Sequence, residues 1–101
     1  MIVISGFIEV AEASIEGARA AVIPMMTESG KEDGCIRYRF YQDVEHAHLF
    51  HVYEEWETAA HLKAHAESAH MKVFRAAMGD LDVKSRDVKM IEVDAGGWKS
   101  L

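Results

Sequence analysis

The order of hydrophobic periodicities along the chain is the feature that most restricts its fold. Alternation around β-branched and aromatic side chains predicts strands at residues 1–10, 35–43, 48–55 and 83–93. Apolar residues at 3.6-residue spacing predict helices at residues 14–29 and 58–78. The resulting order, β-α-β-β-α-β, predicts a ferredoxin-like α+β fold with an antiparallel sheet.

Three positions within these elements carry further structural signals. Pro24 lies inside the first predicted helix, where its missing N–H and its ring predict a kink or a break near Ile23. A second break is expected near Ser68, because serine side chains compete for backbone hydrogen bonds inside helices. In the second strand, strict alternation predicts that Ile36 shares a face with Tyr38.

Apolar side chains occupy both faces of the predicted sheet, although two helices can cover only one. The first strand, for example, has Ile4 and Ile8 on one face and Val3 and Phe7 on the other. A contiguous apolar face that a monomer would expose usually marks an interface. We therefore expect two sheets to pair face to face in a homodimer, which gives a dimeric α+β barrel.

The 101 residues are enough for one domain, expected over residues 1–101 with a core at 1–93 and a tail at 94–101. Trp98 lies in that glycine-containing tail, where it either docks on a surface such as a second subunit or belongs to a loose terminus.

Composition excludes several classes of partner. The formal net charge of −6, without a basic stripe, argues against nucleic acids and anionic membranes. No apolar run approaches the roughly 20 residues that span a bilayer, and the N-terminus has no signal-peptide pattern. Cys35 is the only cysteine, so no intrachain disulfide is possible and small buried packing is its expected role. We expect a cytoplasmic protein.

Two short motifs form an ordered pattern along the chain. The first is E-D-G-C at residues 32–35, followed by Tyr38. The second is Y-E-x-W at residues 53–56, followed by His65, Ser68 and His70. Together they resemble the E-x-G-C-x-x-Y and Y-E-x-W…H-x-x-S-x-H pattern of the antibiotic biosynthesis monooxygenase family, at the same spacings and over nearly the whole chain.

This resemblance implies a quinol monooxygenase-like homodimer with one pocket per subunit, between the sheet and the helices. Some members of the family oxidise phenols, anthrones or quinols with O2 and use no metal, flavin or haem. Others isomerise a small phosphorylated dione. The resemblance therefore constrains the fold more than it constrains the reaction.

Oxygenation without a cofactor requires a base that deprotonates an electron-rich substrate and polar groups that hold the anion. We expect His65 to be that base, because imidazole titrates near neutral pH and this residue matches the histidine of the family pattern. The alternative is a structural histidine hydrogen-bonded to a strand. His70 is the second catalytic candidate, or else an anchor for the second half of its helix.

Five further residues are candidates for the site. Tyr38 either donates a hydrogen bond to a developing oxyanion or is an ordinary strand aromatic. Substrate binding is expected from Trp56, Glu54, His51 and Tyr53. Trp56 either lines the pocket of an aromatic substrate, fills the core, or does both. Glu54 either orients an imidazole or, as is more common for strand acids, pairs with an arginine across the sheet or the dimer.

Metal and haem sites are not expected. His61 and His65 have the i, i+4 spacing that can hold one ion, but there is no HExxH motif and no acid partner at a fixed spacing. Haem-degrading enzymes of a similar fold rely on an asparagine on the first strand and on a tryptophan and a histidine ten residues apart on the second helix. Here the first strand has no asparagine, and the comparable helical positions hold His65 and Arg75. We therefore predict no metal and no cofactor.

The sequence predicts an oxidoreductase, a cofactor-independent monooxygenase that acts on small aromatic, quinol or anthrone-type compounds with O2. One alternative is an isomerase of a small dione or hydroxyketone, which a phosphate-sized basic pocket around Arg37 or Arg39 would favour over ordinary pairing of these arginines with acids. The other is a dimer that binds a small molecule without turnover.

Overall fold

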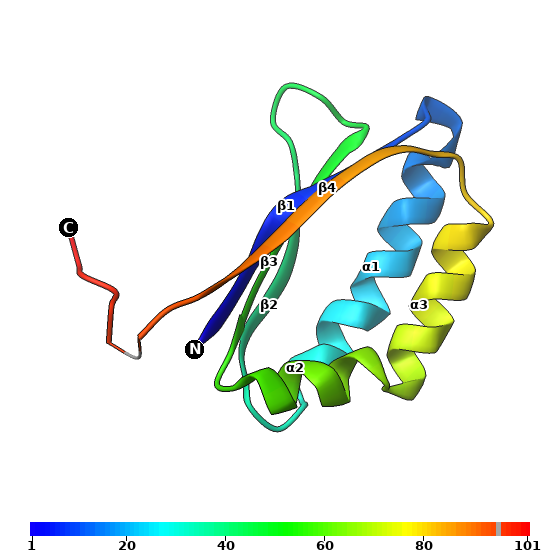
Figure 1. Ribbon diagram of the computed structural model, residues 1–101. Helices are drawn as coiled ribbons and strands as arrows, with labels where there is room; N and C mark the ends of the chain where they lie inside the picture. Colours follow the sequence, from blue (N-terminus) through cyan, green and yellow to red (C-terminus); the bar gives the residue numbers. More distant parts are fainter. Residues whose placement is uncertain (95) are drawn as a thin grey trace.

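The structure is a computed structural model that describes residues 1–94 and 96–101. The strands are β1 (Ile2–Val10), β2 (Cys35–Gln42), β3 (Leu49–Trp56) and β4 (Val83–Glu92). The helices are α1 (Ile15–Ser29), α2 (Ala59–Ala66) and α3 (Ala69–Gly79), and a single 3-10 turn, Glu12–Ser14, precedes α1. The observed order confirms the predicted β-α-β-β-α-β arrangement, with the second helix in two parts (Figure 1).

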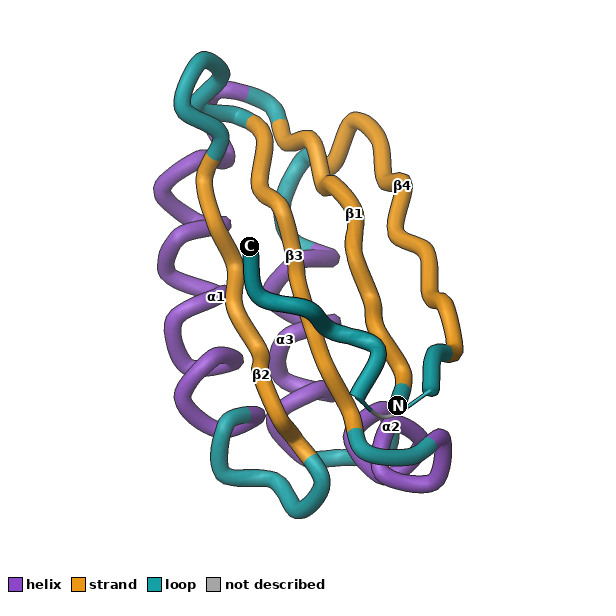
Figure 2. Tube along the Cα trace, turned by 90° about the vertical axis from the view of Figure 1, so that its left-hand side faces the viewer, coloured by secondary structure: helices purple, strands orange, loops and turns teal. Residues whose placement is uncertain are grey.

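The four strands form one antiparallel sheet in the order β2-β3-β1-β4. The three helices all lie on one face of this sheet, and the other face carries no helix (Figures 1 and 2). This is the ferredoxin-like topology that the sequence predicts.

The core lies between the sheet and α1. Trp56 has no exposed surface and Ile2, its partner across β1 and β3, is 1% exposed. From the helix side, the stripe of Ala18, Val22 and Met25 packs onto the same cluster, as 3.6-residue spacing predicts.

The alternative of a break near Ile23 is wrong, because α1 runs without interruption from Ile15 to Ser29 with Pro24 inside it. Proline removes one helical hydrogen bond, but Val22 and Met25 on either side of it are buried against the core and hold the helix. The Thr27 hydroxyl donates an additional hydrogen bond to the Ile23 carbonyl at 3.2 Å.

The break near Ser68 is confirmed. Ser68 is the N-cap of α3, and its hydroxyl accepts a hydrogen bond from the Met71 N–H at 3.2 Å. Thr58 caps α2 in the same way, with the N–H of His61 as donor. Each cap satisfies a backbone donor that the start of a helix leaves free, so the two helices begin as separate elements.

A bulge at the start of β2 overturns the predicted face of Ile36. Cys35 pairs with Trp56 and Arg37 pairs with Glu55, so Ile36 is the extra residue and is 50% exposed. Cys35 packs against the core instead, as expected for a small apolar side chain, and burial raises the pKa of its thiol to about 11.

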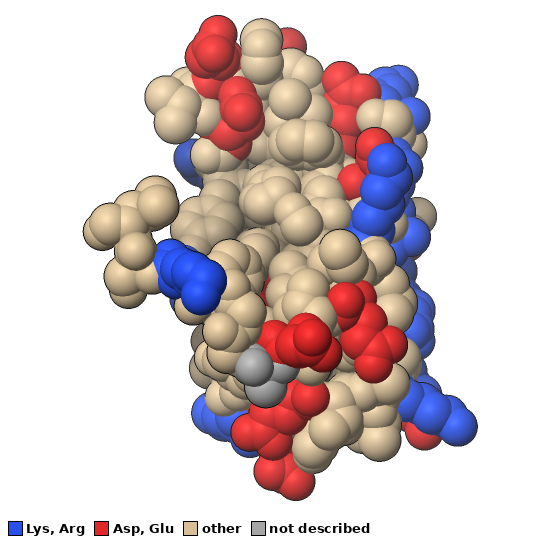
Figure 3. Space-filling model, turned by 60° about the vertical axis from the view of Figure 1, so that its left-hand side comes forward, with Lys and Arg blue, Asp and Glu red and all other residues tan. Residues whose placement is uncertain are grey.

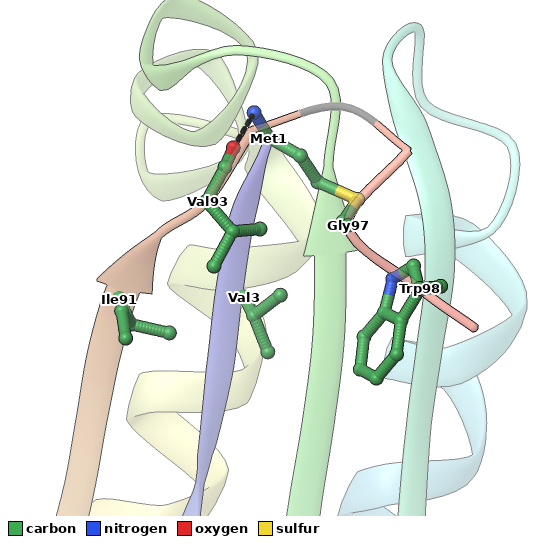
Figure 4. A pocket seen from close by; sticks show the side chains of 6 residues that line it. All are labelled: Met1, Val3, Ile91, Val93, Gly97 and Trp98. Carbon is green, nitrogen blue, oxygen red and sulfur yellow. Dashed lines mark hydrogen bonds between the residues drawn. The ribbon is translucent and has the colours of Figure 1, made fainter.

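The helix-free face of the sheet, which we call the open face, carries exposed apolar side chains from three strands, among them Phe7, Tyr41 and Ile91. Figure 3 shows uncharged side chains over the middle of this side of the molecule, with acidic side chains toward both ends. Trp98 of the tail lies across a cavity of about 190 Å³ from Val3 and Ile91 (Figure 4).

No helix in the described part of the chain is long and apolar enough to cross a membrane.

Candidate functional site

Three polar side chains meet at the end of the molecule where α2 crosses below the sheet (Figure 1). His65 on α2 and His70 on α3 both contact one carboxylate oxygen of Glu32, which lies in the turn between α1 and β2. The distance from Glu32 Oε2 to His65 Nδ1 is 2.5 Å, and to His70 Nε2 it is 3.1 Å. We call these three residues the Glu-His-His cluster.

The turn that carries Glu32 depends on a glycine. Gly34 has a φ of +79°, a conformation that other residues rarely adopt, and a Cβ there would lie 2.1 Å from Cγ of His61. The turn therefore packs directly against the side chain of His61 on α2. This contact brings Glu32 next to the helix that carries His65.

Aromatic rings enclose His65, which is 3% exposed. Its ring centroid lies 4.7 Å from that of Trp56 and 5.3 Å from that of Tyr38. The His70 ring, 5.8 Å away, closes a third side. Packing on several sides holds the imidazole in one orientation.

Glu32 determines which nitrogen of His65 carries the proton. The carboxylate can only accept a hydrogen bond, so Nδ1 carries the hydrogen and the lone pair lies on Nε2. Burial lowers the pKa of His65, and this outweighs the opposing effect of Glu32. The imidazole is therefore neutral at pH 7, and its basic Nε2 has no hydrogen-bond partner among the described residues.

Glu54 is the second buried acid of the site. It lies on the helix-facing side of β3, is 7% exposed, and accepts a hydrogen bond from Nε1 of Trp56 at 2.9 Å. Among the described residues of this one chain it makes no ion pair with an imidazole or an arginine, and the expected pairing with an arginine across the dimer stays a prediction. Burial raises the pKa of this carboxyl to about 7.

Tyr38 lies next to Glu54 on the neighbouring strand and is also buried. Burial, with the negative charges of Glu54 and Glu32, raises the pKa of its phenol well above the usual value. Tyr38 is therefore a neutral hydrogen-bond donor throughout the physiological pH range.

The structure brings five of the seven predicted site residues together and separates the other two. His51 and Tyr53 lie on the open face, because alternation along β3 points them away from Glu54 and Trp56. The His51 ring contacts the Ser5 hydroxyl at 3.0 Å, and Tyr53 donates a hydrogen bond to Glu55. The pocket expected from all seven residues is not formed within one chain.

Arg37 and Arg39, the arginines considered for a basic phosphate pocket, pair with open-face positions of β3. Arg37 donates a hydrogen bond to the Tyr41 hydroxyl and lies over the ring of Tyr53, so it does not reach the Glu-His-His cluster.

A cavity of about 320 Å³ separates α3 from the β1 and β4 side of the sheet. Apolar side chains from three elements and two arginines line it: Ile8, Met71, Phe74, Met78, Val83, Arg75 and Arg86. None of the α3 residues is fully buried, and β4 is exposed along nearly its whole length. The helix therefore stands away from the strand and leaves room for a ligand, and we call this space the α3 cleft.

Sequence reasoning identified His65, His70, Tyr38, Trp56 and Glu54 but assigned no role to Glu32. That residue opens the E-D-G-C motif at residues 32–35, so its motif position was the available signal. The arginines of the α3 cleft, Arg75 and Arg86, were also missed as candidates, because their positions on a helix and an edge strand form no local motif.

The sequence matches one protein family and one curated protein. Residues 1–77 match the antibiotic biosynthesis monooxygenase family. An uncharacterised protein of Synechocystis is 29% identical over 92 residues, which cover 91% of this chain and 63% of that protein. The chain thus spans less than two thirds of that relative.

Solved structures agree closely in backbone. A candidate antibiotic biosynthesis monooxygenase from Nitrosomonas europaea superposes with a TM-score of 0.86 at 24% identity, covering 92% of this chain and 98% of that one. A conserved protein of unknown function from Bacteroides thetaiotaomicron gives 0.83 at 27% identity, over 91% and 96% of the two chains. With more than half of its residues matching the family, this chain belongs to the antibiotic biosynthesis monooxygenase family.

Proposed function

We propose that the protein is a monooxygenase that oxidises a small electron-rich aromatic compound with O2, with His65 as the base. The observation that carries the proposal is the 2.5 Å contact between Glu32 and His65 Nδ1, which leaves Nε2 as a basic nitrogen among aromatic walls. Such an arrangement suits a neutral imidazole that accepts a proton from a bound phenol.

The reaction begins when Nε2 of His65 accepts a proton from a quinol or anthrone. The resulting anion transfers one electron to O2, and the radical pair combines to form a C–O bond to a peroxide. Cleavage of the O–O bond then releases hydroxide, to which His65 returns its proton to give water. In an anthrone, a CH2 group and O2 thereby become C=O and H2O. In a quinol, a ring C–H and O2 are converted so that the products are a hydroxyquinone and H2O. The substrate itself supplies the electrons, and this chemistry needs no further reductant.

Buried polar groups support the anionic stages of this sequence. Tyr38 donates from a phenol that stays protonated, and Glu54, with a pKa of about 7, is partly protonated at neutral pH and can also donate. Trp56 excludes water on the sheet side. These groups stabilise an oxyanion in a dry site, where such hydrogen bonds are strongest.

The α3 cleft is the proposed entrance for the substrate. Its apolar lining suits an aromatic ring, and Arg75 and Arg86 suit an anionic substituent. His51 and Tyr53 then have no part in one subunit's pocket, and we propose that they lie in the interface of the homodimer. Besides the second subunit, the protein would bind a small-molecule substrate and O2.

An isomerase of a small, phosphorylated dione or hydroxyketone is the second candidate, and the arginine pair of the α3 cleft favours it. There a neutral His65 moves a proton between adjacent carbons, and Arg75 and Arg86 hold the phosphate. A non-catalytic ligand-binding dimer uses the same cleft without turnover.

The test is O2 consumption by chelator-treated protein with a panel of hydroquinones and anthrones. Wild-type protein is compared with His65→Ala and with His48→Ala, a matched control whose partly exposed histidine lies just before β3, at the end of that strand far from Trp56. Uptake that falls roughly tenfold or more only in His65→Ala supports the proposal. If O2 uptake is no faster than the uncatalysed rate across the panel, the monooxygenase hypothesis is refuted. The isomerase hypothesis and the ligand-binding hypothesis then remain.

A further inference from the structure

We infer that the Glu-His-His cluster is also a binding site for a divalent transition-metal ion such as Zn²⁺, and that the ion inhibits the proposed oxygenation. The inhibition rests on the proposed function, whereas the metal site itself does not.

The donor set carries the inference. One carboxylate oxygen and two imidazole nitrogens lie within 4.8 Å of one another, on Glu32, His65 and His70. Two imidazoles with one carboxylate favour zinc and its neighbours in the first transition row over Mg²⁺ or Ca²⁺, which prefer oxygen ligands. The sequence pattern pointed instead to His61 and His65, but His61 is held by the Thr58 hydroxyl at 2.8 Å.

The three donor atoms must come to a common spacing to hold an ion, and they already lie within 4.8 Å of one another. Bonds of about 2.0–2.1 Å to zinc place tetrahedral ligand atoms roughly 3.3 Å apart. The separation of Glu32 from His70 Nε2 is 3.1 Å and already fits, and the 2.5 Å contact to His65 must widen. The side chains of Glu32 and His70 can move, because they are 18% and 21% exposed, whereas His65 is fixed by its aromatic neighbours.

An entry route leads to the cluster from the outside of the helix layer. A cavity of about 230 Å³ between α1 and α3 is lined by His70, together with Pro24, Met25 and Phe74. Water in this space can complete the coordination of an ion that has only three protein ligands. The net charge of −6 also favours the approach of a cation.

Binding of the ion changes the tautomer of His65. Coordination requires the lone pair of Nδ1, so the ring hydrogen must move to Nε2. Nε2 is the nitrogen that carries the lone pair in the metal-free site. The metal thus converts the proposed base into a hydrogen-bond donor, and oxygenation stops.

The test combines binding with a spectroscopic readout. Chelator-treated protein is titrated with Zn²⁺ by calorimetry and with Co²⁺ by visible absorption, and ¹⁵N NMR of the imidazoles reports the tautomer. We expect one ion per chain, tetrahedral Co²⁺ bands, and a shift of the His65 proton from Nδ1 to Nε2. The variants Glu32→Gln and His70→Ala should each lower the affinity roughly tenfold or more.

Two control variants distinguish this site from adventitious binding. His48→Ala removes a ring that lies 5.6 Å from His46 on the surface, and Asp33→Asn removes the acid near His61. Both should keep full affinity. Affinity that survives in His70→Ala, or that is lost in His48→Ala, overturns the metal site.

Activity assays then separate the two proposals. If Zn²⁺ binds and suppresses O2 uptake, and His70→Ala relieves the suppression, both the metal site and the proposed oxygenation are supported. If the metal-free protein is inactive and a metal ion activates it, the metal site stands while its inhibitory role and the cofactor-free reaction fail. If no ion binds but uptake proceeds, only the metal site fails.

Discussion

At the scale of single residues, the buried carboxyl of Glu54 couples the site to pH. Its folded-state pKa of about 7 lies above the value of 4.5 for an exposed glutamate, chiefly because of burial. Between these two pH values the folded protein holds a proton that the unfolded chain releases. Stability is therefore greatest below pH 4.5 as far as this group is concerned, and falls as the pH rises toward 7.

We predict that Glu54→Gln removes this loss of stability with rising pH. At pH 8 the variant should be more stable than wild type by roughly 3 kcal/mol, the free-energy equivalent of the pKa difference. The amide keeps the shape and can still accept from Trp56 Nε1. Urea unfolding of both proteins at pH 5 and pH 8 measures the effect. His65 contributes with the opposite sign, because its pKa is lowered, so the difference between the two proteins is the quantity to compare.

Glu57→Gln, at an exposed position just after β3, is the matched control and should change little at either pH. An equal stability difference between Glu54→Gln and wild type at pH 5 and pH 8 would show that Glu54 does not titrate as described.

At the scale of elements, the break between α2 and α3 sets the relative positions of His65 and His70. Ser68 makes the break on both sides, since its hydroxyl accepts from the Met71 N–H and donates to the His65 carbonyl at 2.7 Å. We predict that Ser68→Ala costs about 1 kcal/mol of stability, while Ser68→Asp restores most of it. Thermal unfolding measures this, with the edge-strand variant Ser85→Ala as control. Full stability in Ser68→Ala would contradict the capping role.

The turn before β2 is the other element that shapes the site. We predict that Gly34→Ala destabilises the protein by about 1–3 kcal/mol, because of its positive φ and the clash with His61. Chemical denaturation checks this against Gly79→Ala, where no atom lies within 4 Å of the added Cβ. The double variant Gly34→Ala/His61→Ala should recover part of the loss, and no recovery would show that the clash is unimportant.

At the scale of the whole molecule, we propose that the open face pairs with that of a second copy of the chain. Phe7 is 50% exposed and Ile91 is 61% exposed on adjacent strands, and the tail places Trp98 beside them. We predict a dimer of twice the 11.3 kDa chain mass by light scattering at micromolar concentration. Phe7→Asp should yield monomers, because it places a charge in the apolar interface.

Ile23→Asp is the control for this experiment, since it adds the same charge at a position on α1 that is also exposed, 59% against 50% for Phe7. A monomeric wild-type protein would contradict the pairing of open faces.

The fold followed from sequence because its signals are local. Strand alternation and helical spacing depend on neighbouring residues, and so does the N-cap at Ser68. The two failures have other origins. The bulge at Ile36 breaks the alternation without a sequence signal, and tertiary packing of Val22 and Met25 overrides the effect of Pro24.

The candidate site was less predictable, because its contacts are long-range. Glu32 is 33 residues from His65 and 38 from His70, and no periodicity relates them. Alternation along β3 did separate Tyr53 from Glu54, but only the structure shows that the helices cover the Glu54 side.

O2 uptake by chelator-treated Glu32→Gln and Asp33→Asn tests whether Glu32 holds His65 as a base for oxygenation without a metal. Circular dichroism verifies that both variants fold. We expect kcat to fall roughly tenfold or more in Glu32→Gln with little change in KM, and Asp33→Asn to match wild type. Unchanged uptake in Glu32→Gln, or uptake that requires an added metal, would refute this role of Glu32.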